Sequence, residues 1–196
     1  MDSTGRLAKL AAPVFAIALT VLLRLGLYVW LHRAGYFFGI PWDSFSRTQL
    51  AYAWAQQPYF SAGTGYWLPL QFWLVGSVYV LIKPWVHGSE ILVPVFVNNV
   101  FLIGSLAVTY AIGWRLGGAT VGIIGCMLAG LYSGDVFVSY SALSEPMQIF
   151  FILVTSYYIH DFFESGPAAQ GRLALKAAVS AFLGAATHHV GWFLCL

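Results

Sequence analysis

The sequence predicts an all-α fold: a multi-pass transmembrane helical bundle with an interfacial amphipathic helix in its first outer loop. Hydrophobic residues make up 60% of the chain and charged residues only 8%, whereas soluble domains carry about 25% charged residues. The mean hydropathy is +0.77, and apolar runs long enough to span a membrane recur along the chain. So few charges cannot cover the surface of a soluble domain, and the composition argues against that class.

The first predicted helix covers Leu10 to Leu31. It is longer than the apolar core of a secretory signal, about 7–15 residues, which predicts an uncleaved transmembrane helix. Arg6 and Lys9 precede it and predict a cytoplasmic N-terminus. Arg24 lies within the run; an arginine in a span is often functional, but we interpret this one as snorkelling to the interface.

Residues 32–66 form the most polar part of the chain and are predicted to be an outer loop. Within it, residues 43–54 have the pattern of an amphipathic helix that lies in the membrane interface, with Asp43 at the N-cap position. Aromatic residues are dense in this loop. They fit stacking on sugar faces, but an aromatic belt at the interface is the more common use.

Further apolar runs are predicted to enter the membrane at residues 67–86, 91–114, 119–138, 146–163 and 173–196. The motif Arg115-Leu116-Gly117-Gly118 interrupts the pattern between two of these runs, and Arg172 and Lys176 are expected to lead the last one. The last run ends without polar residues, which predicts that residues 1–196 are the N-terminal part of a longer protein.

The charges conflict with a simple topology. If every run crosses once, Arg115, Arg172 and Lys176 fall outside, against the positive-inside rule. One run is therefore expected to be re-entrant or to cross only in part. The run over 67–86 is the best candidate, because Pro69 lies at its start and Pro84 at its far end.

Few polar residues are available for chemistry. Asp43 and Arg47 are four positions apart and can share one helical face. Near lipid headgroups, such a carboxylate can act as a general base on an acceptor hydroxyl, while a guanidinium grips phosphate oxygens. An N-cap with an intrahelical ion pair explains the same two residues.

Glu145 and His188 are weaker candidates. Glu145 precedes Pro146, so it fits both the start of a helix and a functional carboxylate at the edge of a bundle. His188 and His189 are adjacent in a predicted helix and point in different directions, which makes them poor joint metal ligands; a hydrogen bond between helices is the simpler interpretation. Cys126 and Cys195 lie in apolar runs, so the sequence predicts neither a disulfide framework nor a metal site.

Four motifs occur in a characteristic order. Asp43 is followed by Arg47 after the first helix, and an aromatic Pro-Leu motif opens the next run. An arginine-glycine break and a serine-rich stretch ending in an acid follow. The last three motifs read Tyr66-Trp67-Leu68-Pro69-Leu70-Gln71-Phe72-Trp73, Arg115-Leu116-Gly117-Gly118 and Ser141-Ala142-Leu143-Ser144-Glu145-Pro146.

With these motifs the chain resembles the N-terminal half of GT-C glycosyltransferases. The likeness is greatest to the bacterial group that includes lipid A aminoarabinose transferases and protein O-mannosyltransferases. The resemblance implies that Asp43 is catalytic and that Arg47, Trp67, Glu145 and His188 bind substrate. It also implies that Glu145 faces the same outer cavity as Asp43.

The chain departs from these relatives at three places. Ser44 stands where many relatives have a second acid, Trp67 lies where aminoarabinose transferases carry a lysine, and His188 lies where an arginine is common. These departures put a paired-carboxylate mechanism in doubt and leave the sugar and the acceptor open.

The predicted function is transfer of a sugar from a polyprenyl-phosphate donor to a lipid, glycan or protein acceptor outside the cell membrane. The expected partners are this donor and membrane lipids, with no nucleic acid, because a net charge of +2 offers no clustered basic face. No cofactor is predicted, and a divalent metal is left open, since related oligosaccharyl enzymes use one. The alternatives are a transporter or lipid-binding protein, favoured by the polar pair Asn98-Asn99, and an inactive fragment.

Overall fold

The computed structural model describes residues 3–35, 42–60, 68–82 and 92–188, and within them every element of regular secondary structure is a helix. The predicted all-α class is therefore confirmed for this part of the chain. The helices are, in order, α1 (Ser3–Arg33), α2 (Trp42–Gln56), α3 (Pro69–Ile82), α4 (Leu92–Leu131), α5 (Ser133–Ser139), α6 (Glu145–Glu164) and α7 (Pro167–Ala185).

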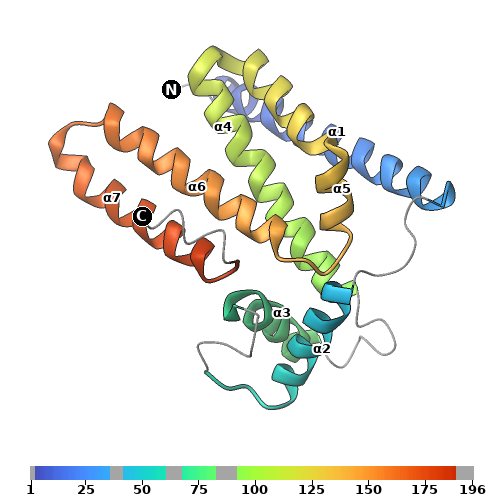
Figure 1. Ribbon diagram of the computed structural model, residues 1–196. Helices are drawn as coiled ribbons and strands as arrows, with labels where there is room; N and C mark the ends of the chain where they lie inside the picture. The colour runs from blue at the N-terminus through green and yellow to red at the C-terminus, as the bar shows by residue number, and fades with distance from the viewer. Residues whose placement is uncertain (1–2, 36–41, 61–67, 83–91, 189–196) are drawn as a thin grey trace.

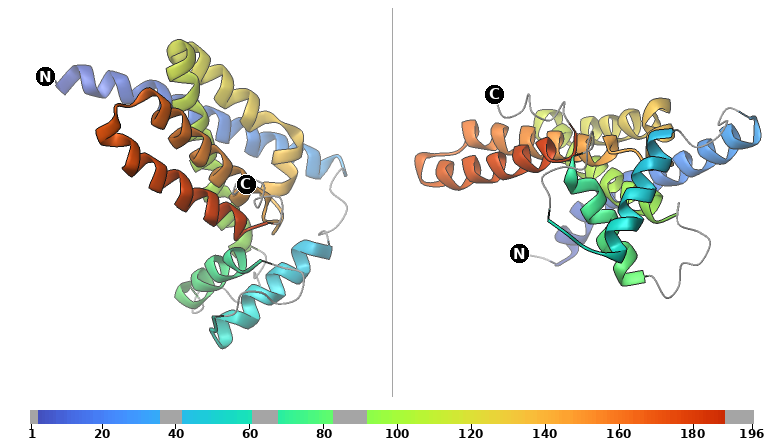
Figure 2. Two further views of the ribbon diagram at one scale, coloured as in Figure 1. Left: turned by 60° about the vertical axis from the view of Figure 1, so that its left-hand side comes forward. Right: turned by 60° about the horizontal axis from the view of Figure 1, so that its bottom comes forward.

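The helices form a long bundle with a two-helix unit at one end (Figure 1). In the bundle, α4 packs against α1 and α6, and α6 pairs with α7; α2 and α3 pair with each other. The left view of Figure 2 also shows the α2–α3 pair at one end of the bundle. The helix predicted over 43–54 is thus confirmed as α2, and it lies beside α3.

Helix α4 is a hairpin. Gly117 is extended and Gly118 has a φ of +78°, a conformation that favours glycine, and the chain reverses there (Figure 1). The two arms approach closely, because a Cβ added to Gly113 would lie 2.7 Å from the Cα of Gly122. The predicted break at Arg115 to Gly118 is therefore confirmed, and small residues let the two arms pack.

Two predicted boundaries are wrong. The run over 119–138 is not one helix: Tyr132 is extended, so α4 ends at Leu131 and α5 starts at Ser133. The last helix starts at Pro167 rather than Leu173, because Gly166 is extended and proline suits the first turn of a helix. Arg172 and Lys176 consequently lie inside α7 and do not precede it.

Helix α3 is short. Its 14 residues extend over about 21 Å, less than the roughly 30 Å of a bilayer core. Two of the described helices are long and apolar enough to cross a membrane, over Ala11–Arg33 and Leu92–Leu131.

The core has two parts. One part joins the α2–α3 pair to α4 and α6, and it consists of Ala51, Trp54, Phe72, Val75, Tyr79, Val93, Val97, Met147 and Phe151. The other lies between α1 and the two arms of α4, and it consists of Ala16, Leu102, Leu106, Tyr110 and Cys126. Apolar packing thus anchors the two-helix unit to the bundle and so helps to position the first turn of α2.

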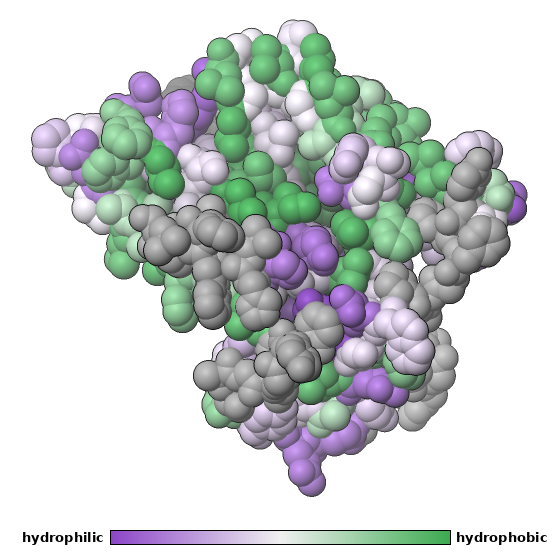
Figure 3. Space-filling model, viewed as in Figure 1, coloured by the Kyte–Doolittle hydropathy of each residue, from purple (hydrophilic) through white to green (hydrophobic). Residues whose placement is uncertain are grey.

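The outside of the bundle is also apolar. Exposed hydrophobic side chains recur at helical spacing, and Figure 3 shows a broad hydrophobic surface over the bundle. They include Val14, Phe15, Leu22, Leu25, Leu92, Phe96, Val100, Ile103, Leu175, Val179 and Phe182. Soluble monomers rarely expose contiguous apolar surface on this scale.

Candidate functional site

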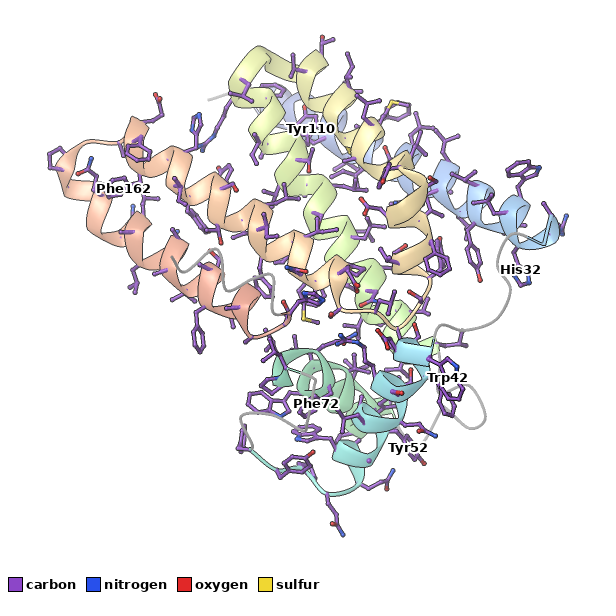
Figure 4. The ribbon with its side chains drawn as sticks, in the orientation of Figure 1. His32, Trp42, Tyr52, Phe72, Tyr110 and Phe162 are labelled. Carbon is purple, nitrogen blue, oxygen red and sulfur yellow. The ribbon has the colours of Figure 1, made fainter. Side chains whose placement is uncertain are left out.

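The junction between the α2–α3 pair and the bundle gathers polar groups. Figure 4 places Trp42, and with it the first turn of α2, next to the bundle, while Tyr52 lies farther along α2 and away from it. Hydrophilic residues collect on the surface at this junction (Figure 3). The end of α7 reaches the same place, since the amide of Leu70 donates a hydrogen bond of 3.1 Å to the carbonyl of Ala186.

Arg47 connects three parts of the fold at this junction. Its side chain is only 7% exposed, and its Nη1 donates to Oε1 of Gln71 on α3 at 2.6 Å. Nε2 of Gln71 in turn donates to the carbonyl of Ala142 at 2.9 Å. Because one amide serves both the guanidinium and the backbone, Gln71 sets the position of the α5–α6 connection relative to α2.

Ser44 makes a second link between α2 and that connection. It is fully buried, and its Oγ accepts a hydrogen bond of 3.2 Å from the amide of Ala142. An acid at this position would bury a negative charge in the interior, which is unfavourable. This explains structurally why position 44 holds a serine and not an acid. Its neighbour Asp43 is exposed, in the first turn of α2.

Electrostatics join the two acidic candidates at Arg47. Burial lowers the pKa of Arg47, and the carboxylates of Glu145 and Asp43 act in the opposite direction. Glu145 begins α6 and has a buried Oε2 without a hydrogen-bond partner among the described residues. Both acids therefore act electrostatically on the same arginine, and the prediction that they share a cavity stays a prediction.

The connection that carries Glu145 is held by α4. Asn98 is completely buried and donates to the carbonyls of Ser141 at 2.7 Å and Leu143 at 2.8 Å. Asn99 donates to the carbonyl of Ser139 at 3.2 Å. Irregular backbone inside an apolar protein needs such partners, because water is absent. The two asparagines stand out in the sequence as polar residues in an apolar run, but their role as donors to this backbone is visible only in the fold.

Arg24 binds α5, which leads into the same connection. The interpretation that its side chain snorkels to the interface is wrong. Its side chain is 1% exposed and donates to the carbonyls of Gly130 and Asp135 and, at 2.7 Å, to Oγ of Ser139. A cation suits the end of the second arm of α4, where carbonyls are left without helical partners. The residue therefore points inward, away from the surface.

A small cavity lies beside Arg24. Its volume is about 30 Å³, and Asp135 and Ser139 are among the residues that line it. This is room for about two water molecules, which is far too small for a sugar or a lipid.

The remaining predicted residues are less informative. His188 is half-buried just beyond α7, and its amide donates to the carbonyl of Gly184 at 3.4 Å. Trp67 and His189 lie outside the described residues. Within the described ranges, His, Cys, Asp and Glu side chains form no group of three that could hold a metal ion. The substrate-binding roles of Arg47, Trp67, Glu145 and His188 stay predictions.

The opposite end of the bundle carries basic residues. Arg115 forms an ion pair with Asp161, donates to the hydroxyl of Tyr157 at 2.6 Å, and lies 4.3 Å from the centre of that ring. Arg172 and Lys176, in the first half of α7, are both exposed. The start of α1 lies at this end as well (Figure 1).

No known protein family, curated protein or solved structure matches the chain. Membership of the GT-C glycosyltransferases stays a prediction. A function for the junction between the α2–α3 pair and the bundle is therefore argued from the residues at that junction.

Proposed function

We propose that the chain is a multi-pass protein of the cell membrane. The exposed apolar side chains of α1, α4 and α7 support this, because lipid is the solvent in which such a surface is stable. In this arrangement α1, both arms of α4, α6 and α7 enter the bilayer, and the α2–α3 pair lies on its outer surface.

The distribution of charge supports the same orientation. Arg115, next to the α4 turn, and Arg172, in the second turn of α7, lie towards the end that also holds the start of α1, and Lys176 follows one turn farther along α7. This end faces the cytoplasm under the positive-inside rule. The short α3, which packs on α2, supports a run over 67–86 that does not cross the membrane. In that arrangement Arg115 and Arg172 fall inside, as the positive-inside rule prefers.

We further propose that the junction is the site of a membrane glycosyltransferase that uses a polyprenyl-phosphate sugar. The observation that carries this proposal is the pair of hydrogen bonds by which Gln71 ties Arg47, one turn after Asp43 on α2, to the connection that leads to Glu145. A carboxylate exposed at the lip of a lipid-embedded protein can meet both a donor held in the bilayer and an acceptor in water.

The proposed chemistry needs few groups. Asp43 takes the proton from the acceptor hydroxyl, whose oxygen bonds to the anomeric carbon of the sugar. The bond from that carbon to the phosphate oxygen breaks, and polyprenyl phosphate leaves with the electron pair. Arg47 is buried and its guanidinium is held by a hydrogen bond to Gln71. Its positive charge therefore stabilises the leaving phosphate electrostatically from a fixed, buried position.

A transporter is less well supported. Transporters place broken helices and polar pairs around a substrate near the middle of the membrane. Here the break in α4 lies at the basic end, and Asn98 and Asn99 donate to the backbone between Ser139 and Leu143. Both features thus have structural explanations.

The test is sugar transfer in membranes that contain the chain. Membranes are given radiolabelled polyprenyl-phosphate hexose or pentose, and both label transfer and the release of polyprenyl phosphate are measured. Loss of a general base lowers the rate by about 10²- to 10⁴-fold, so Asp43→Asn is expected to fall within that range.

Glu164→Gln is the matched control, because Glu164 is an exposed acid at the opposite end of the bundle. This variant is expected to keep the wild-type rate. Transfer at the wild-type rate by Asp43→Asn would remove Asp43 from catalysis, and no transfer by the unaltered chain from either donor class would argue against the whole proposal.

A further inference from the structure

Two grooves adjoin on the surface of α6, which lies between α4 and α7 (Figure 1). The groove towards α7 has a volume of about 380 Å³ and the groove towards α4 about 220 Å³. Val154 and Tyr158 line both. Together the grooves reach the size of a ligand site, about 300–1,000 Å³.

The walls of the grooves are almost entirely apolar. Ala107, Ala111 and Val108 of α4 line one side, and Leu175, Val179 and Leu183 of α7 line the other. Small residues leave space on the α4 side, and branched side chains border the α7 side. Such a surface fits a flexible hydrocarbon chain and offers few partners for a polar ligand.

One charged side chain interrupts this surface. Lys176 lines the α7 groove, is exposed, and holds its Nζ 5.1 Å from the centre of the Tyr158 ring. Arg172 is exposed one turn nearer the start of α7. In the described part of the chain neither cation forms an ion pair, since Asp161 is bound by Arg115. A lysine within an apolar helix is costly unless it has a partner.

We propose that these grooves bind one anionic phospholipid of the cytoplasmic leaflet. An acyl chain lies along Val154 and Tyr158, and the phosphate lies at Lys176 and Arg172. The occupant is argued from charge complementarity: Lys176 lines the apolar groove, Arg172 lies one turn nearer the start of α7, and neither forms an ion pair with a described residue. Cytoplasmic leaflets carry anionic lipids, which would supply the missing charge. The inference rests on the proposed membrane embedding and not on sugar transfer.

The test is lipid binding by the purified, delipidated chain in detergent. Phosphatidylglycerol and phosphatidylcholine with identical acyl chains are titrated separately, and native mass spectrometry counts the bound lipids. A basic residue near a headgroup contributes about 1 kcal/mol, or roughly fivefold in affinity. Lys176→Gln is therefore expected to weaken phosphatidylglycerol binding about fivefold and to leave phosphatidylcholine binding unchanged.

Two further variants separate a site from general charge. Arg33→Gln removes an exposed cation at the other end of the bundle and is expected to change nothing. Val179→Trp fills the groove and is expected to abolish binding of the first phosphatidylglycerol molecule. Equal losses in Lys176→Gln and Arg33→Gln, or no preference for phosphatidylglycerol in the unaltered chain, would overturn the proposal.

The embedding itself is tested separately by extraction of membranes with alkaline carbonate. Release of the chain into the supernatant would refute the membrane assignment. Retention of the chain, together with a failure of lipid selectivity, would refute the lipid site alone.

Discussion

Arginine shows how single residues organise this protein. Arg24 and Arg47 are both buried, and each donates to groups that come from distant parts of the sequence. Arg24 binds the region from Gly130 to Ser139, while Arg47 reaches Ala142 through Gln71. Arg24 thus holds α5 and Arg47 helps to hold the connection that follows it, which leads to Glu145 at the start of α6.

Replacing Arg24 by methionine tests this role. The change removes a cation that serves two backbone carbonyls and one hydroxyl, and it leaves those groups buried without a donor. Each such hydrogen bond to a charged group is worth about 1.5–3 kcal/mol, but the desolvation penalty of the buried guanidinium offsets part of the three together. The free energy of unfolding is therefore expected to fall by about 2–5 kcal/mol. Unfolding in increasing dodecyl sulfate, followed by circular dichroism, measures the change.

Arg33→Met is the control for charge and size, since Arg33 is exposed at the end of α1. It is expected to change the free energy of unfolding by less than about 0.5 kcal/mol. Similar stability of the two variants would restore the snorkelling interpretation of Arg24.

At the residue scale, the candidate acids could be predicted from the sequence, but the residues that hold the backbone around them could not. Asp43 and Glu145 stand out because acids are rare in this chain. The supporting residues Gln71, Asn98 and Asn99 act on backbone carbonyls, which have no sequence signature of their own. A buried arginine and a snorkelling one are also indistinguishable until the packing of neighbouring helices is known.

The α4 hairpin is the element that sets the course of the chain. A straight helix of 40 residues would extend over about 60 Å and separate Asn98 from the α5–α6 connection. Because the chain reverses at Gly117 and Gly118, the second arm returns to the end of the bundle at which the first arm began. The arginine-glycine break allowed this turn to be predicted, whereas the shorter break at Tyr132 has no comparable signal.

Gly118→Ala tests the turn. Gly118 has a φ of +78°, and a Cβ added there would meet open space. Alanine therefore adds backbone strain without a steric clash. With ψ at −169°, Gly118 lies in a region occupied almost only by glycine, which costs another residue about 1–3 kcal/mol, and the free energy of unfolding is expected to fall by that amount. The same dodecyl sulfate titration measures it.

Gly171→Ala provides the comparison within a helix. Gly171 lies in α7 with a negative φ, and a Cβ there would also meet open space. Alanine in a helix is favoured over glycine by about 0.5–1 kcal/mol, so this variant is expected to be stabilised. A Gly118→Ala protein as stable as wild type would show that the turn does not depend on the conformation of Gly118.

At the scale of the whole molecule, the two ends of the bundle differ. Asp43 and Glu145 lie at one end, while Arg115 and Arg172 lie towards the other, with Lys176 midway along α7. Hydropathy alone does not separate the run over 67–86 from the others, because a short helix packed on a neighbour can be as apolar as one that spans. The positive-inside rule shows the inconsistency, and the short α3 packed on α2 supports the proposal that this run does not cross.

Cysteine labelling in intact cells tests this arrangement most directly. Single cysteines replace Gln57, Glu145 or Gly166 in a chain without Cys126 and Cys195, and labelling in detergent confirms that each thiol reacts. With a membrane-impermeant maleimide, we predict that the cysteines at positions 57 and 145 are labelled from outside and the one at 166 only after permeabilisation. Labelling at position 145 only after permeabilisation would contradict a shared outer site for Asp43 and Glu145.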